Sequence, residues 1–272
     1  MNCCMPEVIY CAGGNKKFAA IAMDCGFVYG AQLPGTVYFA PEFVDQNWKS
    51  PDLEKYVEAV SSHMPRIATV LDWERWDQLG TAIDWAYAIA PYVREAVVII
   101  PKVKTARSGW QNYIPKSIDG LEVRLGYSVK TKYGGTPIHL TQFLDWPIHL
   151  LGGNPLIQAR IAGLFRDDNC LVDAPKLNVV SIDGNYHQRM AVRHNRFFIP
   201  NGSAQYARDR FWPTLKEFYS QKWGDGSSRA DAPYKAFSNS CKTIKAMWVG
   251  PEAVKQVLGE LEKERLKILS NK

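Results

Sequence analysis

The sequence predicts an α/β fold, a (β/α)8 TIM-like barrel with additional C-terminal helices. Short apolar segments alternate with segments of helical spacing, and a polar or glycine-containing loop follows most of the apolar segments. We count seven or eight candidate strands before residue 183, and 272 residues suffice for one barrel. This count and length favour a closed barrel over an open doubly wound sheet. We expect residues 1–200 to form the barrel and residues 201–272 to pack on it as helices.

The first hundred residues contain five candidate strands and three candidate helices. The strands are 7–12, 26–32, 36–39, 67–71 and 96–100, and the helices are 16–25, 51–64 and 78–93. The second helix has a typical start, with Ser50 as N-cap and Pro51 at the first helical position. Charged residues follow two of these strands: Asp72 comes directly after 67–71, and Lys102 lies two positions after 96–100.

The second half of the chain continues the alternation and then becomes helical. Its candidate strands are 123–129, 148–151 and 177–182, with a helix from Pro155 between the last two. Segment 104–120 mixes aromatic and turn residues and is expected to be a loop. Helices are expected at 204–221, 233–248 and 251–270, and the charge pattern of the last one is typical of a solvated face.

The composition indicates which binding partners and which cellular compartment to expect. The formal net charge of +6 and the pI near 8.9 favour a polyanionic partner such as nucleic acid. Six cysteines occur without a CxxC pair, which indicates reduced thiols. The N-terminus lacks a signal-peptide pattern, and no apolar run is long enough to cross a bilayer. We therefore expect a cytoplasmic protein without a membrane partner.

Three acids occupy equivalent positions directly after apolar runs: Asp45, Asp72 and Asp183. In a parallel barrel these positions would meet at one mouth. Two carboxylates around one anomeric carbon can split a glycosidic bond, one as nucleophile and the other as proton carrier. The alternative is structural, because an aspartate after a strand is often a helix N-cap or a turn residue.

The order and spacing of four motifs resemble the tRNA-guanine transglycosylase family, whose barrel exchanges guanine for a 7-deazaguanine. VDQNW (44–48) stands in place of a VDSGG-type segment, and LDWE (71–74) in place of an FDE-type segment. LGYSV (125–129) is similar to a GLAVG-type turn. HLLGGNP (149–155) followed by Ile182-Asp183 is similar to a YLMGVGTP-type strand and turn that precede the nucleophile. The resemblance covers roughly residues 37–190.

Longer phrases narrow the resemblance to one branch of that family. VYFAPEFVDQNW, VRLGYSVKTKYGGT and VVSIDGNYHQRMA resemble the short, largely phage-borne DNA-guanine transglycosylases (DpdA-type). This resemblance implies a pentosyltransferase that replaces guanine in DNA with a free 7-deazaguanine base, such as a cyano- or aminomethyl-substituted one. The implied partners are DNA and that base, no energy cofactor is needed, and the location would be the host cytoplasm if the protein is phage-encoded.

The resemblance also implies roles for individual residues. Asp183 would attack C1′ and form a covalent glycosyl-enzyme, and Asp45 would take the N9 proton of the incoming base. Asp72 would accept hydrogen bonds from N1–H and the exocyclic amine of a guanine-like base. The other residues assigned to substrate binding are Gly126, Leu151, Gly152, Gly153, Trp48 and Lys102. Reaching C1′ requires the nucleotide to leave its stack.

Basic residues follow the same strands. Lys130, Lys132, Arg189 and Arg193 are the candidates for nucleic-acid binding. The loops expected near the mouth carry further cations, and the full set there is Lys102, Lys104, Arg107, Lys116, Arg124, Lys130 and Lys132. Any one of these residues can instead be a solubilising surface charge. The pair Gly134-Gly135 could alternatively cradle a small phosphate.

The sequence departs from the family in ways that leave two alternatives open. Only Cys241 follows Asp183, so the CxCxxC…H zinc site of the tRNA enzymes cannot be built and no metal is expected. Gln46-Asn47 replaces the glycine pair after Asp45, and Lys102 stands near where a glutamine often follows the fourth strand. The first alternative is a tRNA-guanine transglycosylase-like enzyme. The second is a non-catalytic DNA-binding barrel.

Overall fold

The computed structural model describes residues 5–11, 15–104, 109–131, 134–164, 177–200, 211–219 and 229–270. They belong to two compact units. The first consists of Met1–Gly14, Val28–Gly153 and Ile157–Gly184, and the second of Asn15–Phe27, Asn154–Leu156 and Asn185–Lys272. The second unit thus includes segments before residue 200. The predicted division at that residue, with the later helices packed on the barrel, stays a prediction.

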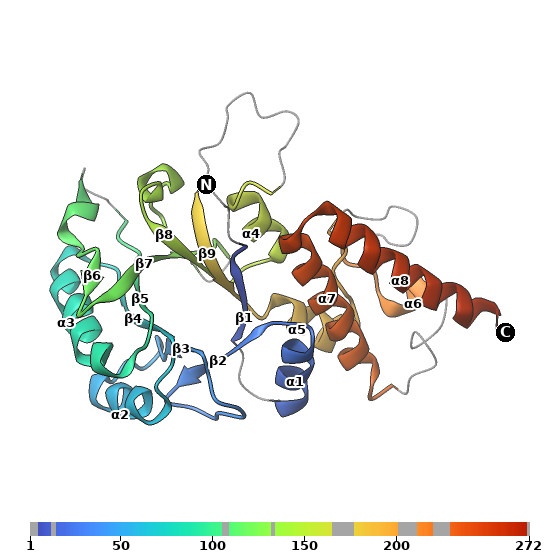
Figure 1. Cartoon of the computed structure of the whole chain (residues 1–272), viewed down its shortest axis with the longest axis horizontal. Helices are drawn as coiled ribbons and strands as arrows, with labels where there is room; N and C mark the ends of the chain where they lie inside the picture. Colours follow the sequence, from blue (N-terminus) through green and yellow to red (C-terminus); the bar gives the residue numbers. More distant parts are fainter. Residues whose placement is uncertain are drawn as a thin grey trace. The chain divides into compact units, whose positions relative to one another are not determined.

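A closed barrel of parallel strands forms the first unit, as the sequence predicts (Figure 1). The strands are β1 (Glu7–Cys11), β2 (Val28–Leu33), β3 (Phe43–Gln46), β4 (Ile67–Trp73), β5 (Ala96–Pro101), β7 (Leu121–Ser128), β8 (Pro147–Leu151) and β9 (Asn178–Asp183). Each pairs in parallel with the next, β5 pairs with β7, and β9 pairs with β1 to close the sheet. The short β6 (Ser117–Ile118) pairs antiparallel with β7.

The helices divide between the two units. In the first unit, α2 (Leu53–His63) and α3 (Leu79–Ile89) follow β3 and β4, and α3 packs against β4 and β5. Short 3-10 turns complete this unit: η1 (Trp76–Gln78), η2 (Ala90–Tyr92), η3 (Trp110–Tyr113) and η4 (Leu140–Phe143). The helix α4 (Pro155–Ile161) precedes β9. Among the described residues, no helix is both long and apolar enough to cross a membrane.

The second unit is helical. Its helices are α1 (Lys16–Asp24), α5 (Tyr186–His194), α6 (Leu215–Tyr219), α7 (Ala232–Val249) and α8 (Pro251–Ser270). The aromatic core of this unit is centred on Phe237, a buried residue of α7. Its ring meets the Phe18 ring edge-on, with centroids 4.9 Å apart, and lies parallel to the His187 ring, with centroids 5.0 Å apart. Burial among these rings lowers the pKa of His187 to about 3, so its imidazole is neutral at physiological pH.

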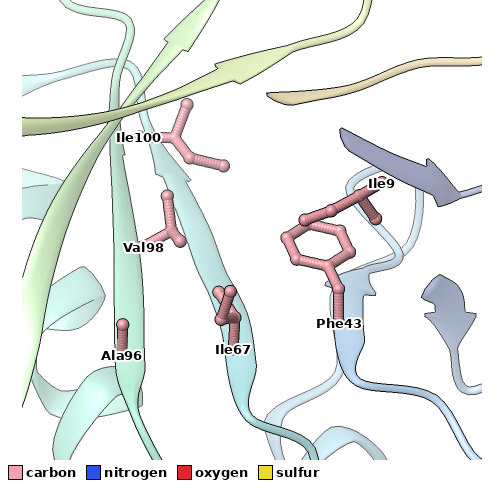
Figure 2. Packing of buried hydrophobic residues seen from close by; sticks show 6 residues of the cluster. All are labelled: Ile9, Phe43, Ile67, Ala96, Val98 and Ile100. Carbon is pink, nitrogen blue, oxygen red and sulfur yellow. The ribbon is translucent and has the colours of Figure 1, made fainter. Parts of the chain in front are cut away.

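A cluster of buried hydrophobic side chains lies in the barrel interior (Figure 2). The cluster consists of Ile9, Phe43, Ile67, Ala96, Val98 and Ile100. These come from β1, β3, β4 and β5, so the layer joins strands from distant parts of the chain. Burying each of the large members stabilises the fold by roughly 1.5–3 kcal/mol. These described side chains therefore form a packed core inside the barrel.

Paired charges surround the amino ends of the strands. Arg66, just before β4, contacts Glu7, Glu42 and Glu95. Its Nε lies 3.0 Å from Glu42 Oε2, and its Nη1 lies 2.7 Å from Glu95 Oε2. Glu95 also pairs with Arg124, which corrects the prediction that Arg124 lies near the mouth. Arg124 is buried on β7, and Glu95 and Glu122 at the amino ends of β5 and β7 attract its guanidinium.

Two local predictions were wrong. The strand expected at 36–39 is irregular, and β3 begins at Phe43 instead. Tyr29 holds that segment: its ring meets the Phe39 ring edge-on, and its Oη accepts a hydrogen bond from Tyr38 N–H. The N-cap of α2 is Asp52 rather than Ser50, because the Asp52 carboxylate accepts from Lys55 N–H.

The remaining boundaries differ less. The helix expected at 78–93 is divided into η1, α3 and η2, and the loop expected at 104–120 contains η3 and β6. Of the helix expected at 204–221, the described part contains α6, while 204–210 and 220–221 lie outside the described residues. The helices expected at 233–248 and 251–270 correspond to α7 and α8.

Removing Arg66 tests the charge cluster at the amino ends. Arg66→Ala leaves three carboxylates without their shared cation, so we expect the free energy of unfolding in urea to fall by about 2–3 kcal/mol. Arg94→Ala is the matched control, because its side chain is 51% exposed and its ion pair is with Glu42. We expect that variant to lose less than about 1 kcal/mol. Equal losses in the two variants would contradict a structural role for Arg66.

Candidate active site

A cavity of about 880 Å³ lies at the carboxyl ends of the barrel strands. Its lining includes Asp45, Asp72, Lys102 and Asp183. The structure thus brings the three acids of the sequence prediction to one place. A parallel barrel produces this convergence because all its strands end at the same face. The cavity is large enough for a drug-sized ligand or a nucleotide.

Asp183 is the last residue of β9 and is fixed by the turn after β8. The N–H of Gly152 donates to Asp183 Oδ1 at 3.2 Å and to its carbonyl oxygen at 3.1 Å. The buried amide of Gln158, on α4, donates to the carbonyl oxygens of Asp183 and Gly152, both at 2.7 Å. The turn and the strand end are therefore held together, and the carboxylate has a defined orientation. Gly152 adopts a φ of +64°, which suits glycine.

His149 lies behind Asp183 inside the barrel. It is fully buried on β8, in register with Ser181, and its ring stacks on Phe43 with centroids 4.9 Å apart. Its Nδ1 is 2.8 Å from Ser181 Oγ. Its Nε2 is 3.4 Å from Asp183 Oδ1, a contact without hydrogen-bond geometry, and has no hydrogen-bond partner among the described residues. Both His149 and Gly152 therefore face Oδ1, and these contacts leave Oδ2 for a ligand.

Asp45 lies in β3 and is held by Thr69. The Thr69 hydroxyl donates to Asp45 Oδ1 at 2.7 Å and accepts from Gln46 N–H at 3.0 Å, so its direction is fixed. Burial raises the pKa of Asp45 to about 7, and the negative charge of Asp183 adds to that shift. Near neutral pH, Asp45 can therefore hold or release a proton, which is the property of a general acid–base group.

Asp72 and Lys102 form an ion pair on the same wall. Lys102, directly after β5, donates to Asp72 Oδ2, and both side chains are mostly buried. Burial raises the pKa of Asp72, and the ammonium group of Lys102 opposes that shift. The pair presents one anionic acceptor and one cationic donor side by side. Such a pair can recognise a ligand edge that carries both donors and an acceptor.

The remaining residues predicted to bind the substrate differ in whether they line the cavity. Leu151, Gly152, Gly153 and Trp48 line the cavity. Gly126 is not among the described residues that line it, because the side chains of Leu151 and Ile100 cover it: an added Cβ would lie 2.8 Å from Leu151 Cδ1 and 2.7 Å from Ile100 Cγ1. Its predicted backbone contact with the base stays a prediction.

The candidate nucleic-acid residues are distributed over both units. Lys130 is exposed directly after Val129, which lines the cavity. Lys132 lies outside the described residues. Arg189 and the exposed Arg193 are on α5 of the second unit, where the Arg189 guanidinium lies 5.3 Å from the centre of the Tyr186 ring. Their roles in nucleic-acid binding stay predictions.

Sequence reasoning missed three supporting residues: His149, Thr69 and Gln158. Each is a polar residue in a largely apolar segment, which is the signal that could have drawn attention to them. Cys11 was also missed. It ends β1 beside the core cluster, and burial together with the charges of Asp45 and Asp183 raises the pKa of its thiol. The thiol is therefore neutral and a poor nucleophile.

Potential metal-ligating side chains do not cluster in the part of the chain that the structure describes. There, no group of three or more His, Cys, Asp and Glu side chains is placed to hold an ion. The acids at the cavity are instead engaged by Thr69, Lys102 and the Gly152 amide.

The fold and the site define a class: a closed parallel α/β barrel with an acid-lined cavity at the carboxyl ends of its strands. The model of a family of unknown function (DUF6610) matches residues 22–249, and the chain belongs to that family. Neither the curated proteins nor the solved structures contain a significant match to the chain.

The raised pKa of Asp45 predicts a pH-dependent stability. The folded protein keeps the Asp45 proton up to about pH 7, whereas the unfolded chain releases it near the ordinary value of 3.8. Stability should therefore fall as pH rises from about 4 to 7 and then level off. Asp45→Asn removes this penalty, so at pH 8 we expect it to exceed the wild type by up to about 4 kcal/mol in urea unfolding. Identical pH profiles of the two proteins would contradict the raised pKa.

Proposed function

We propose that this protein is a base-exchange transglycosylase, which replaces guanine in DNA with a free 7-deazaguanine base. The observation that carries the proposal is the pair of carboxylates on one cavity, Asp183 fixed by a backbone N–H and Asp45 poised to exchange a proton near pH 7. Two carboxylates with different environments are what a retaining glycosyl transfer requires. The motif order around both acids supports the same chemistry.

In the first half-reaction, Asp183 Oδ2 attacks C1′ of the target nucleotide. The C1′–N9 bond breaks, and the leaving guanine takes a proton from Asp45. The products are free guanine and a deoxyribosyl ester of Asp183, with inversion at C1′. Contacts of Gly152 and His149 with Oδ1 fix the carboxylate while Oδ2 reacts, which reduces the entropic part of the barrier.

In the second half-reaction, a 7-deazaguanine occupies the space that guanine has left. Its N9–H proton passes to the Asp45 carboxylate, N9 attacks C1′, and the ester bond to Asp183 breaks. Both acids return to their starting states, and two inversions give net retention. The cycle is balanced without a metal, a nucleotide cofactor or an external oxidant.

The ion pair of Asp72 and Lys102 accounts for selection of guanine-like bases. The Asp72 carboxylate can accept from N1–H and the exocyclic amine, while the Lys102 ammonium can donate to O6. Adenine presents a donor where guanine has O6 and no N1–H, so it would leave the buried pair unsatisfied. Such mismatches are costly because the polar groups stay desolvated. Leu151 would cover one face of the ring.

The positive net charge and the resemblance to the DNA branch support DNA as the acceptor. A cytoplasmic location stays a prediction that goes with this substrate. The tRNA alternative differs in the polymer and not in the chemistry, so the same assay distinguishes the two.

The exchange reaction itself can be measured directly. Wild-type protein is incubated with isotope-labelled cyano- or aminomethyl-7-deazaguanine and, in parallel, with DNA or unmodified tRNA, and the nucleosides are analysed by mass spectrometry. We expect the label in DNA, and we expect Asp183→Asn to lower the rate by at least about 10³-fold because the nucleophile is lost. DNA affinity should be unchanged in that variant. Label in tRNA alone, or in neither polymer, would contradict the proposal.

The contact of His149 with Asp183 makes a separate prediction about rate. His149→Phe keeps an aromatic ring against Phe43 but removes both nitrogens, so Asp183 loses one of its two neighbours at Oδ1. We expect kcat for exchange to fall about 10- to 100-fold with little change in KM for the free base. Thermal unfolding of the variant verifies folding. A higher KM with unchanged kcat would assign His149 to base binding instead.

A further inference from the structure

Aromatic side chains stand on the loops after three neighbouring strands, at the rim of the cavity. Trp48 follows β3 and is 54% exposed, Trp76 follows β4, and Tyr113 follows β5 and is 63% exposed. Trp48 and Trp76 also line the cavity. Because β3, β4 and β5 are adjacent in the barrel, these loops follow one another along a single arc of the mouth. We call the three residues the aromatic rim.

The aromatic rim is held in place from below. Trp73, fully buried at the end of β4, meets Trp76 edge-on with centroids 5.0 Å apart, and Trp76 in turn meets Tyr113 at 6.3 Å. The turn that carries Trp76 is fixed by Gln78, whose Oε1 accepts from Glu74 N–H and Arg75 N–H, both at 3.0 Å. Trp76 and Tyr113 are therefore preorganised, and a ligand need not order these two rings on binding.

Cations alternate with these rings. Lys49 Nζ lies 5.4 Å from the centre of the Trp48 ring, and Lys104 lines the cavity after β5. Arg75 lies beside Trp76 and is paired with Asp77, so its charge is partly compensated. Aromatic faces interleaved with lysines are the pattern by which proteins bind single-stranded nucleic acid, with bases stacked on the rings and phosphates near the cations.

We propose that the aromatic rim binds the unpaired nucleotides that flank the target guanine, and that the acceptor is single-stranded or locally opened DNA. This inference rests on the proposed function for the identity of the polymer. In an intact duplex, the faces of neighbouring bases are covered by their own stack and cannot reach Trp48 or Tyr113. In an open strand these faces are free, and the target nucleotide enters the cavity without the cost of unpairing it.

Binding to an oligonucleotide without guanine tests the rim separately from the exchange reaction. The full chain is titrated into fluorescein-labelled dT12, and into the same oligonucleotide paired with dA12, with anisotropy as the readout. We expect dT12 to bind at least about tenfold more tightly than the duplex. Trp48→Ala and Tyr113→Ala should each weaken dT12 binding by about 5- to 100-fold. Trp48→Phe should restore most of the affinity, because it retains a stacking face.

Tyr87→Ala is the matched control. Tyr87 is 46% exposed on α3 and is not among the described residues that line the cavity, so its removal should leave dT12 binding unchanged. Wild-type affinity in both rim variants, or equal affinity for duplex and single strand, would overturn the proposal. Tighter binding of U12 than of dT12 would also overturn it, because the occupant would then be RNA.

The two proposals fail in different ways. Because dT12 carries no guanine, its binding measures contact with the rim and not base exchange by Asp183 and Asp45. A rim-dependent preference for dT12 together with no exchange would contradict the proposed function alone. Exchange into duplex DNA that is unaffected by Trp48→Ala and Tyr113→Ala would contradict the rim alone.

Discussion

The pairing of β9 with β1 closes the sheet, and the candidate site depends on that closure. In register, Ile9 lies opposite Asp183 and Glu7 opposite Ser181, so the last strand is fixed against the first. Closure brings Asp45, Asp72 and Asp183, which are far apart in the sequence, to the same face. The packed layer of Figure 2 lies inside the barrel and excludes water there. An open sheet would leave its edge strands apart and these acids without a common cavity.

The acidic side chains are paired with arginines at one end of the barrel and repel one another at the other end. At the amino ends, Arg66 and Arg124 compensate several glutamates. At the carboxyl ends, Asp45 and Asp183 line the same cavity, and the raised pKa of Asp45 leaves its carboxyl group partly protonated near physiological pH. Protonation of Asp45 relieves its repulsion with the Asp183 carboxylate. This difference favours a stabilising role for one end and a chemical role for the other.

Much of this arrangement could be predicted from the sequence, because apolar segments followed by an acid identify strand ends. Asp72 and Asp183 were located in this way. The position of β3 could not be predicted, because residues 36–39 have strand-like composition but are held against Tyr29 through the Phe39 ring and the Tyr38 N–H. His149 could not be assigned either. Its neighbours Ile148 and Leu150 are also buried, so the alternation that would show its direction is absent. The ion pair of Lys102 with Asp72 could not be predicted, because it depends on the register between β4 and β5.

The most direct test of the account is whether Asp183 forms a covalent bond with C1′. Wild-type protein is mixed with guanine-containing single-stranded DNA in the absence of free base, quenched with acid and digested, and the peptides are sequenced by mass spectrometry. The account predicts a peptide in which Asp183 carries deoxyribose, and release of the sugar link when a 7-deazaguanine is added before quenching. An adduct on another residue, or guanine release without any adduct, would contradict it.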